Sequence, residues 1–337
     1  MSAGRQPRRR RLGSFRGSRP PRWTDDRARR PSPARTDHPT LVRAPRPAPA
    51  PESPMRLTVI GSGPAAPELD TPASGNLVSS DGTAVLLDCG YGVVGRLRST
   101  IDPRALDGVV IGHLHADHFL DLAALRYMHP WNGGGDRRPA VWLPPGGRSR
   151  LVGLAEMMSE RPSFFEEAFD LAEYESDGPF EIGDLKITPS PMQHYVPAWA
   201  MTVADRSGAR LVYGGDTGPT DRLLAAARRA DLLIVEATLR SVGEDEVTRG
   251  HCTLDEAIAI ASAAEVDRTL ITHYPSVRRA DVQAAALAAG TRFSVAVPGT
   301  QIDVVPASDR PATADAMVPG QGTGGVALGH REAALAV

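Results

Sequence analysis

The sequence predicts a mixed α/β (α+β) fold in which two β-sheets pack together and helices flank them. Short strand-like runs occur in both halves of the chain, and helical patterns lie between and after them. No short repeat period is visible, which argues against a solenoid. With 337 residues, of which 41% are hydrophobic, the chain is long enough to bury a large core.

The first half is predicted to alternate short strands with helices. Strands are expected at residues 56–60, 77–80, 84–88 and 109–111, and helices at 119–128 and, after the run at 140–143, at 148–159. Residues 162–181 form an acidic stretch of mixed character. In the second half, strands are expected at 185–188, 198–204, 210–213, 232–236, 269–272, 293–297 and 302–305, and helices at 220–229, 254–264 and 280–289.

The two ends differ in composition from the body at residues 55–305. Residues 1–54 contain 14 Arg and 4 acidic residues among many Pro and Ser, so this segment is expected to be disordered. It is interpreted either as an extension upstream of a true start at Met55 or as a basic arm that contacts nucleic acid. Residues 306–337, rich in Ala, Gly and Pro, are expected to form a disordered tail.

Charge and composition restrict the classes of partner. Residues 55–337 carry 24 basic and 36 acidic residues, a net charge of −12, so a nucleic-acid substrate would require a local basic patch. Two cysteines, Cys89 and Cys252, provide no disulfide framework and indicate a reducing cytoplasm. No apolar run reaches 18 residues and the N-terminus lacks a secretory apolar region, so neither a membrane span nor export is expected. The sequence leaves the oligomeric state open.

A dense group of potential metal ligands follows the predicted strand at 109–111. His113, His115, Asp117 and His118 fall within six positions. In an extended chain His113 and His115 point to the same side, whereas Asp117 and His118 point elsewhere. This spacing predicts two adjacent ions with at least two ligands each. Nitrogen and carboxylate donors without thiolates favour two zinc ions, with manganese or iron as alternatives.

Three further candidate ligands lie where predicted strands end. These are His194, Asp216 and His273. Each alone is also compatible with an ordinary core or surface residue, but together with the first motif they complete a two-metal donor set. Asp216 is a natural bridging ligand, because a carboxylate between two dications lowers their repulsion, and a bound water would then become a nucleophile near neutral pH. Asp88 and Glu236 are predicted to support the ligands rather than to bind metal.

The complete ligand series resembles that of the metallo-β-lactamase fold over residues 55–305. The resemblance implies a four-layer αββα sandwich with two metals at one edge of the sheets. It implies that His113, His115 and His194 hold one zinc, that Asp117, His118 and His273 hold the other, and that Asp216 bridges them. It also implies that Asp117 orients the nucleophilic water and takes its proton.

The segment Gly250-His251-Cys252-Thr253 resembles the ribonuclease Z branch of zinc phosphodiesterases. There, His251 would stabilise charge on the phosphoryl group or protonate the leaving alkoxide. The transfer-RNA-binding arm of ribonuclease Z cannot fit in the short stretch between His194 and Asp216. The loop at residues 70–76 is similar to that of arm-less bacterial hydrolases, including actinobacterial cyclic-nucleotide phosphodiesterases, which favours a small phosphodiester as substrate.

Three alternatives remain open at the level of sequence. The chain resembles ribonuclease Z closely enough that processing of RNA 3′ ends is the main one. The same activated hydroxide attacks lactones, thioesters or β-lactams, because a fold does not determine its substrate. A non-enzymatic nucleic-acid-binding module with a structural metal site is the third, although structural zinc sites are usually closed by four protein ligands per ion.

Overall fold

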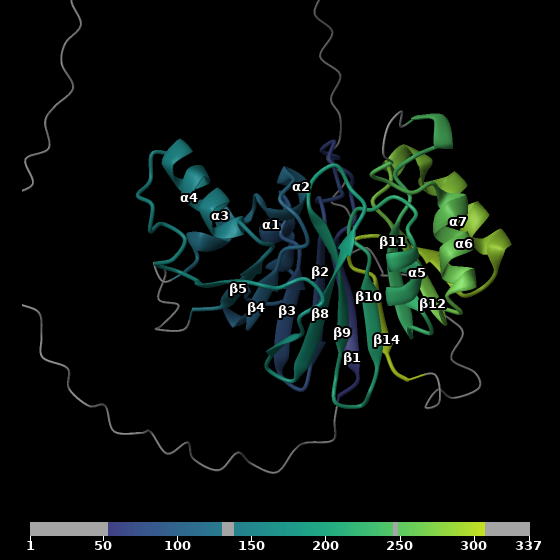
Figure 1. The fold of residues 1–337 in the computed structure, drawn as a ribbon, viewed down its shortest axis with the longest axis horizontal. Helices are drawn as coiled ribbons and strands as arrows, with labels where there is room; N and C mark the ends of the chain where they lie inside the picture. Colours follow the sequence, from purple (N-terminus) through teal and green to yellow (C-terminus); the bar gives the residue numbers. More distant parts are fainter. Residues whose placement is uncertain (1–52, 130–137, 245–248, 307–337) are drawn as a thin grey trace, which may run out of the picture. The chain divides into compact units, whose positions relative to one another are not determined.

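Two seven-stranded sheets form the centre of the fold in the computed structural model, which describes residues 53–129, 138–244 and 249–306. The expected extensions, 1–54 and 306–337, fall almost entirely outside these residues. The strand order is β14-β1-β2-β3-β4-β5-β6 in the first sheet and β13-β12-β11-β10-β9-β8-β7 in the second. Helices cover the outer face of each sheet (Figure 1), as expected for an αββα sandwich.

The first sheet is built from both ends of the described chain. Its last strand, β14 (Gln301–Val304), pairs antiparallel with the first, β1 (Met55–Gly61). The neighbours β2 (Gly75–Ser80) and β3 (Thr83–Leu87) continue the antiparallel half. A parallel half follows, with β4 (Gly108–Val110), β5 (Ala140–Leu143) and β6 (Asp170–Glu173).

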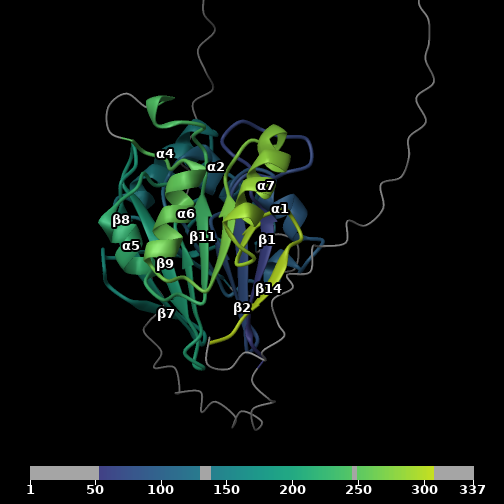
Figure 2. The same cartoon turned by 90° about the vertical axis from the view of Figure 1, so that its right-hand side faces the viewer.

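The second sheet repeats this arrangement of an antiparallel and a parallel half. Figure 2 shows β7, β8 and β9 on one side of the view and β1 and β14 of the first sheet on the other. The antiparallel strands are β7 (Phe180–Ile182), β8 (Leu185–Met192), β9 (Ala198–Ala204) and β10 (Arg210–Tyr213). Strands β11 (Leu232–Glu236), β12 (Arg268–Thr272) and β13 (Phe293–Val295) run parallel to β10.

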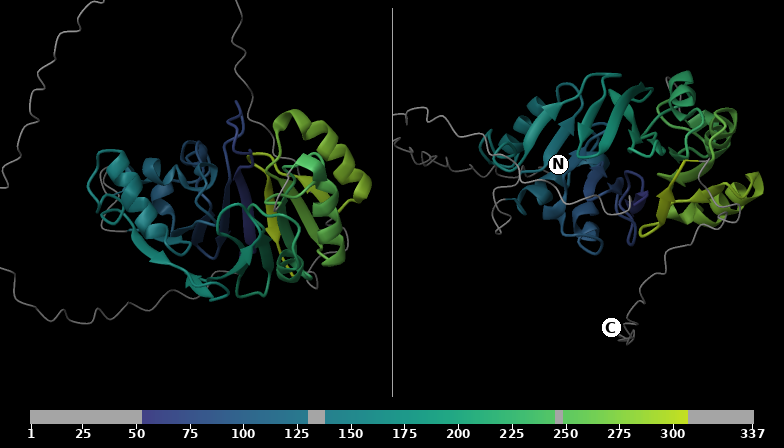
Figure 3. Two further views of the ribbon diagram at one scale, coloured as in Figure 1. Left: turned by 45° about the horizontal axis from the view of Figure 1, so that its top comes forward. Right: turned by 90° about the horizontal axis from the view of Figure 1, so that it is seen from below.

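Helices of the two halves of the chain lie on opposite sides of the strands (Figure 3). The first group packs on the first sheet: α1 (Val93–Leu97), α2 (Ala116–Phe119), α3 (Leu122–Arg126) and α4 (Gly147–Met157). The second group packs on the second sheet: α5 (Asp221–Ala227), α6 (Leu254–Ala263) and α7 (Arg279–Ala289). Short 3-10 turns occur at Pro103–Ala105, Val242–Glu244 and Ser276–Arg278. Among the described helices, none is long and apolar enough to cross a membrane.

Alternation along the strands separates three apolar layers. On β11, Leu232 and Ile234 point into the core between the sheets, whereas Leu233 and Val235 pack against α5, α6 and α7. On β3, Val85 and Leu87 enter the same central core and Leu86 faces the first helix group. Strands buried on both faces explain why these segments are almost continuously apolar in the sequence.

The prediction was wrong in detail where elements are short. The helix expected at 119–128 is two short helices, α2 and α3, and the first begins inside the metal motif. The acidic stretch 162–181 contains β6 and the start of β7. Neither strand shows a regular apolar alternation, and α1, with five residues, is too short for helical periodicity to show. Cys89 and Cys252 are buried free thiols, and burial raises the pKa of both.

Truncation of a side chain in the central core should destabilise the protein strongly. Leu211 on β10 is completely buried between the sheets. We expect Leu211→Ala to lower the free energy of unfolding by about 2–5 kcal/mol, because burial is lost and a cavity remains. Chemical denaturation measures this change. Leu287→Ala on the outer side of α7, where the side chain is 59% exposed, is the matched control and should change stability by less than about 0.5 kcal/mol.

Candidate metal centre

The seven predicted ligands come together at one end of the two sheets. The motif follows β4 of the first sheet, and α2 lies near the upper end of the strands in Figure 1. The other three ligands follow β8, β10 and β12 of the second sheet. Sites in open α/β sheets form at the carboxyl ends of parallel strands, and β4, β10 and β12 place their following loops accordingly.

The potential ligand atoms of the described residues form three groups, of which two share one carboxylate and the third consists of Glu236, His251 and His273. The first consists of His113, His115, His194 and Asp216. The second consists of Asp117, His118, His273 and the same Asp216. Within each group all the ligand atoms lie within 4.8 Å of one another. The seven side chains singled out in the sequence therefore lie in two neighbouring groups that have Asp216 in common.

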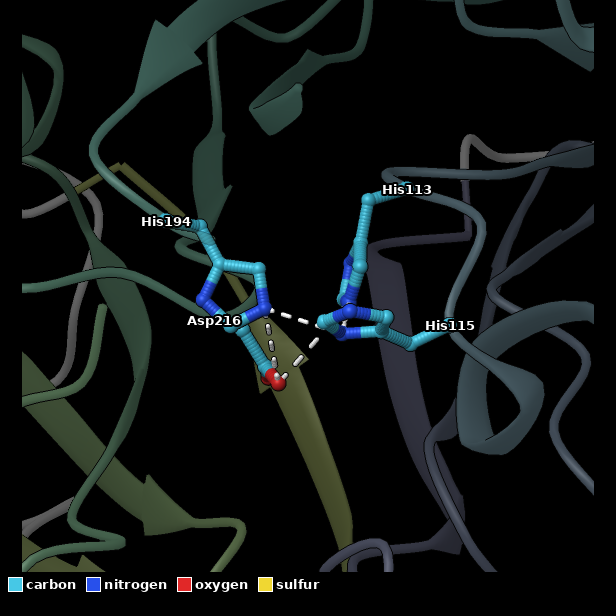
Figure 4. A group of neighbouring side chains, drawn as sticks. All are labelled: His113, His115, His194 and Asp216. Atoms are coloured by element: carbon cyan, nitrogen blue, oxygen red, sulfur yellow. Dashed lines mark hydrogen bonds and ion pairs between the residues drawn. The ribbon is translucent and has the colours of Figure 1, made fainter. Parts of the chain in front are cut away.

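In the first group, imidazole nitrogens converge on one point (Figure 4). His115 Nδ1 lies 3.1 Å from His113 Nε2 and 3.0 Å from His194 Nε2. Asp216 Oδ2 lies 3.9 Å from both of those Nε2 atoms. His115 is extended and caps α2, so its ring faces His113 from the neighbouring turn of the loop.

In the second group, carboxylates and imidazoles alternate. Asp117 Oδ2 is 3.1 Å from His273 Nε2 and 3.4 Å from His118 Nε2. Asp216 contacts the same two rings, with Oδ1 3.3 Å from His118 Nε2 and Oδ2 3.5 Å from His273 Nε2. All four side chains are buried. Because these acids and imidazoles are buried away from water, their charges must be compensated by neighbouring groups.

Hydrogen bonds behind three of the rings fix which nitrogen faces the centre. His194 Nδ1 donates to the carbonyl of Gly250 at 2.7 Å. His118 Nδ1 lies 2.6 Å from Asp88 Oδ2, and His273 Nδ1 lies 2.9 Å from the hydroxyl of Thr238. That hydroxyl donates to the carbonyl of His273, so it accepts from the ring. In each case the hydrogen bond engages Nδ1 and leaves Nε2 facing the centre, where it is the nitrogen that a metal ion would bind.

Asp88 holds more than one part of this centre, as predicted for a supporting residue. Besides His118, its carboxylate accepts from the backbone N–H of Gly112 at 2.7 Å and from the hydroxyl of Tyr213 at 2.6 Å. Asp88, at the end of β3, has a φ of 61°, which is an uncommon conformation for a non-glycine residue. Gly90 follows two residues later, and a Cβ there would lie 1.9 Å from the carbonyl of Asp117. The chain after β3 therefore packs directly beneath the motif.

The pKa values of the histidines shift in opposite directions in the two groups, because burial dominates in the first and nearby charges dominate in the second. Burial lowers the pKa of His113 and His115, and it lowers that of His194 to about 4. These imidazoles are neutral at neutral pH, as ligands must be. Burial also disfavours protons on His118 and His273, but the nearby carboxylates, chiefly Asp216, raise the pKa of both.

The carboxylates respond in the complementary way. Burial opposes the charge on Asp117 and Asp216, but the imidazoles of His118 and His273 outweigh it and hold both pKa values below the usual range. In the second group, acids and imidazoles therefore stabilise each other's charged forms. A donor set of imidazole and carboxylate groups, converging and largely buried, fits divalent transition metal ions such as zinc.

His251 lies beside the metal groups and is paired with Glu236. His251 Nδ1 is 2.7 Å from Glu236 Oε1 and 4.0 Å from Asp216 Oδ2. Burial alone would lower the pKa of His251, but Glu236 raises it. Thr253, two residues later, begins α6 with a capping box to Glu256, which orders the loop that carries His251. Glu236 therefore lies directly behind His251, and its carboxylate also forms a group of potential ligand atoms with His251 and His273.

Sequence reasoning missed several residues that orient the centre. Tyr213, Thr238 and the Gly250 carbonyl act only through tertiary hydrogen bonds. Tyr213 had one available signal, since it precedes Gly214-Gly215-Asp216 at the end of β10. His273 adopts a left-handed conformation with φ 54°, which positions its ring and which no sequence pattern indicates.

The fold and this site together define a metallo-hydrolase. Residues 83–274 match the beta-lactamase superfamily domain family, and the chain belongs to that family. An uncharacterised protein of Mycobacterium leprae is 34% identical over 225 residues, covering 66% of this chain and 78% of that protein. Ribonuclease Z of Ignicoccus hospitalis is 26% identical over 275 residues, covering 68% and 90%. The crystal structure of the metallo-beta-lactamase fold protein YhfI from Bacillus subtilis has a TM-score of 0.63 and 26% identity, covering 74% of this chain and all of that one.

Loss of the Asp88 carboxylate should weaken metal binding without removing a ligand. In Asp88→Asn the partner of His118 loses its charge at nearly constant volume. We expect metal affinity to fall by about 10- to 100-fold, which is the usual effect of removing a group that hydrogen-bonds to a metal ligand. Competition titration with a chromophoric zinc chelator measures it. The control is Asp303→Asn, which removes a carboxylate paired with Arg56 on the surface; equal affinity of the two variants would contradict the role assigned to Asp88.

Proposed function

We propose that the protein is a dinuclear zinc hydrolase that cleaves a phosphodiester, specifically that of a small or cyclic nucleotide. The observation that carries this proposal is the pair of ligand groups joined at Asp216, with the His251–Glu236 pair beside them. Displacement at phosphorus is accelerated by two adjacent ions, which stabilise the attacking and leaving oxygens. It is also accelerated by a proton donor, which protonates the leaving group.

Each ion is assigned to one ligand group. His113, His115 and His194 would hold one ion, and Asp117, His118 and His273 the other, with Asp216 shared. When bound, the pair of ions supplies Lewis acidity and a nucleophile derived from water at neutral pH. Zinc is favoured by the imidazole-rich donor set, with manganese or iron as alternatives.

Asp117 and His251 are the groups assigned to proton transfer. The low pKa of Asp117 keeps its carboxylate ionised, so an oxygen can accept a hydrogen bond from the attacking water, orient it and take its proton. His251 donates Nδ1–H to Glu236, whose carboxylate also accepts from the backbone N–H of Thr217 at 2.8 Å and of Thr238 at 3.2 Å. A fixed anion behind the ring favours the imidazolium, which gives its Nε2 proton to the leaving alkoxide.

A small substrate is supported by the connection between His194 and Asp216. This segment is occupied by β9 and β10, which pair antiparallel through a short turn, so it offers no arm for a folded RNA. The net charge of −12 over residues 55–337 also disfavours a long polyanion. Both observations favour a phosphodiester that carries few charges.

RNA 3′-end processing is the second candidate function. It is favoured by the similarity to the ribonuclease Z of Ignicoccus hospitalis, which extends over most of both chains. Both functions would use the same ligand groups, and they differ in the surrounding surface that binds the substrate. A direct comparison of substrates separates them.

The purified protein should contain two metal ions per chain and hydrolyse bis(p-nitrophenyl) phosphate and cyclic AMP. Asp216→Ala should lose metal and rate together, because this carboxylate belongs to both groups. Mass spectrometry for metals and release of p-nitrophenol provide the readouts. Two bound metals without turnover of either ester would exclude the phosphodiesterase, and cleavage of a precursor transfer RNA in preference to these esters would establish the second candidate.

His251→Ala should retain both metals and lose about 10²- to 10⁴-fold in kcat, the usual contribution of a positioned general acid. Glu236→Gln should lower kcat less than His251→Ala does, because the imidazole of His251 remains. If Glu236 acts through His251, the double variant will be no slower than His251→Ala alone. A double variant that multiplies the two losses would show that the residues act independently, and loss of metal in His251→Ala would make it a ligand.

A further inference from the structure

Tyr195 places an exposed aromatic ring at the entrance of the metal centre. It directly follows the ligand His194 and is 54% exposed. Its ring centroid lies 5.0 Å from that of His194 and 5.5 Å from that of His251. One side of the ring is therefore directed toward the reacting region, and much of the rest meets solvent.

The backbone of Gly250 holds this ring in position. A Cβ on Gly250 would lie 2.7 Å from two carbons of the Tyr195 ring, so the ring rests on a residue without a side chain. The carbonyl of the same glycine accepts the hydrogen bond from His194 Nδ1. The tyrosine, the metal ligand before it and the loop carrying His251 thus form one packed unit, and the ring needs little ordering when a ligand arrives.

A second half-exposed tyrosine shows how a structural ring differs. Tyr127 is 51% exposed, but its hydroxyl donates to Glu160 at 3.2 Å and its ring packs against Phe164 at 5.4 Å between centroids. It lies on the first helix group, beside α3. Tyr195 instead contacts imidazoles of the site, and more than half of its surface is exposed beside them. A part of a substrate that projects from the reacting phosphate would therefore pass this ring.

We infer that Tyr195 is a specificity-determining residue that stacks on the nucleobase of the substrate. This inference rests on the proposed phosphodiesterase function and adds the residue that would recognise the nucleoside of its substrate. Bases stack on aromatic side chains through their π faces, so this recognition selects nucleotides over base-free esters while tolerating different bases. The ring acts on binding, because it lies beside the groups that perform the chemistry and is not one of them.

The test compares two esters with the same leaving group: thymidine 5′-(p-nitrophenyl phosphate), which carries a base, and methyl p-nitrophenyl phosphate, which does not. Tyr195→Ala and Tyr195→Leu should raise KM for the thymidine ester about tenfold, within the range measured for the loss of one base stack. Tyr195→Phe should retain the wild-type KM. For the methyl ester, KM should rise much less than for the thymidine ester in the Ala and Leu variants, so the ratio of the two KM values reports the stack, and the metal content of each variant reports any loss of the packed unit.

Tyr127→Ala is the matched control and should leave both esters unaffected. Equal effects of Tyr195→Ala on both esters, or full retention of KM in Tyr195→Leu, would overturn the stacking role, since the residue would then act by packing on Gly250. The outcomes also separate the two proposals. If the wild-type protein cleaves neither ester, the phosphodiesterase itself fails; if it cleaves both with no preference that depends on Tyr195, only the recognition of a base fails.

Discussion

The buried carboxylate of Asp88 connects the two sheets at the metal centre. It accepts three hydrogen bonds, from the Gly112 N–H that begins the motif, from the ring of His118, and from the hydroxyl of Tyr213 on the second sheet. A fully buried carboxylate is tolerated only when its charge is satisfied, and these donors provide that. The packing of the two sheets therefore determines the orientation of the His118 ring. Through the Asp88 carboxylate, the geometry of the site depends on the fold.

The surrounding charges make the centre suitable for cations. Carboxylates raise the pKa values of His118 and His273 despite burial, so anionic groups outweigh desolvation at these two rings. Imidazoles hold the carboxylates ionised in return. Such a cluster would be costly to bury in a protein without a binding role. The orientation of the rings by Gly250, Thr238 and Asp88 reduces the ordering that ligand binding requires.

The sequence predicted the ligand groups because four of the ligands lie in six consecutive residues, and the others follow predicted strands. It could not show that His194, Asp216 and His273 meet this motif, because that depends on how two sheets pack; the family resemblance supplied the grouping. Hydrogen bonds from Tyr213 and Thr238 join residues far apart in the chain, so no local pattern reveals them. Strands of three or four residues, such as β6 and β7, leave too few positions for an alternation to be recognised.

The two ligand groups differ chemically although they share Asp216. The first combines three imidazoles with one carboxylate, and its histidines are neutral. The second has two imidazoles and two carboxylates, and Asp88 stands behind one of its rings. Oxygen-rich donor sets accept harder ions such as manganese, whereas imidazole-rich sets favour zinc. The second position is therefore the one at which metal identity is less constrained, and it is also the one that contains Asp117, the proposed acceptor of the proton from water. If the two groups hold ions as proposed, exchange of the ion at the second group would alter catalysis without disturbing the donors of the first.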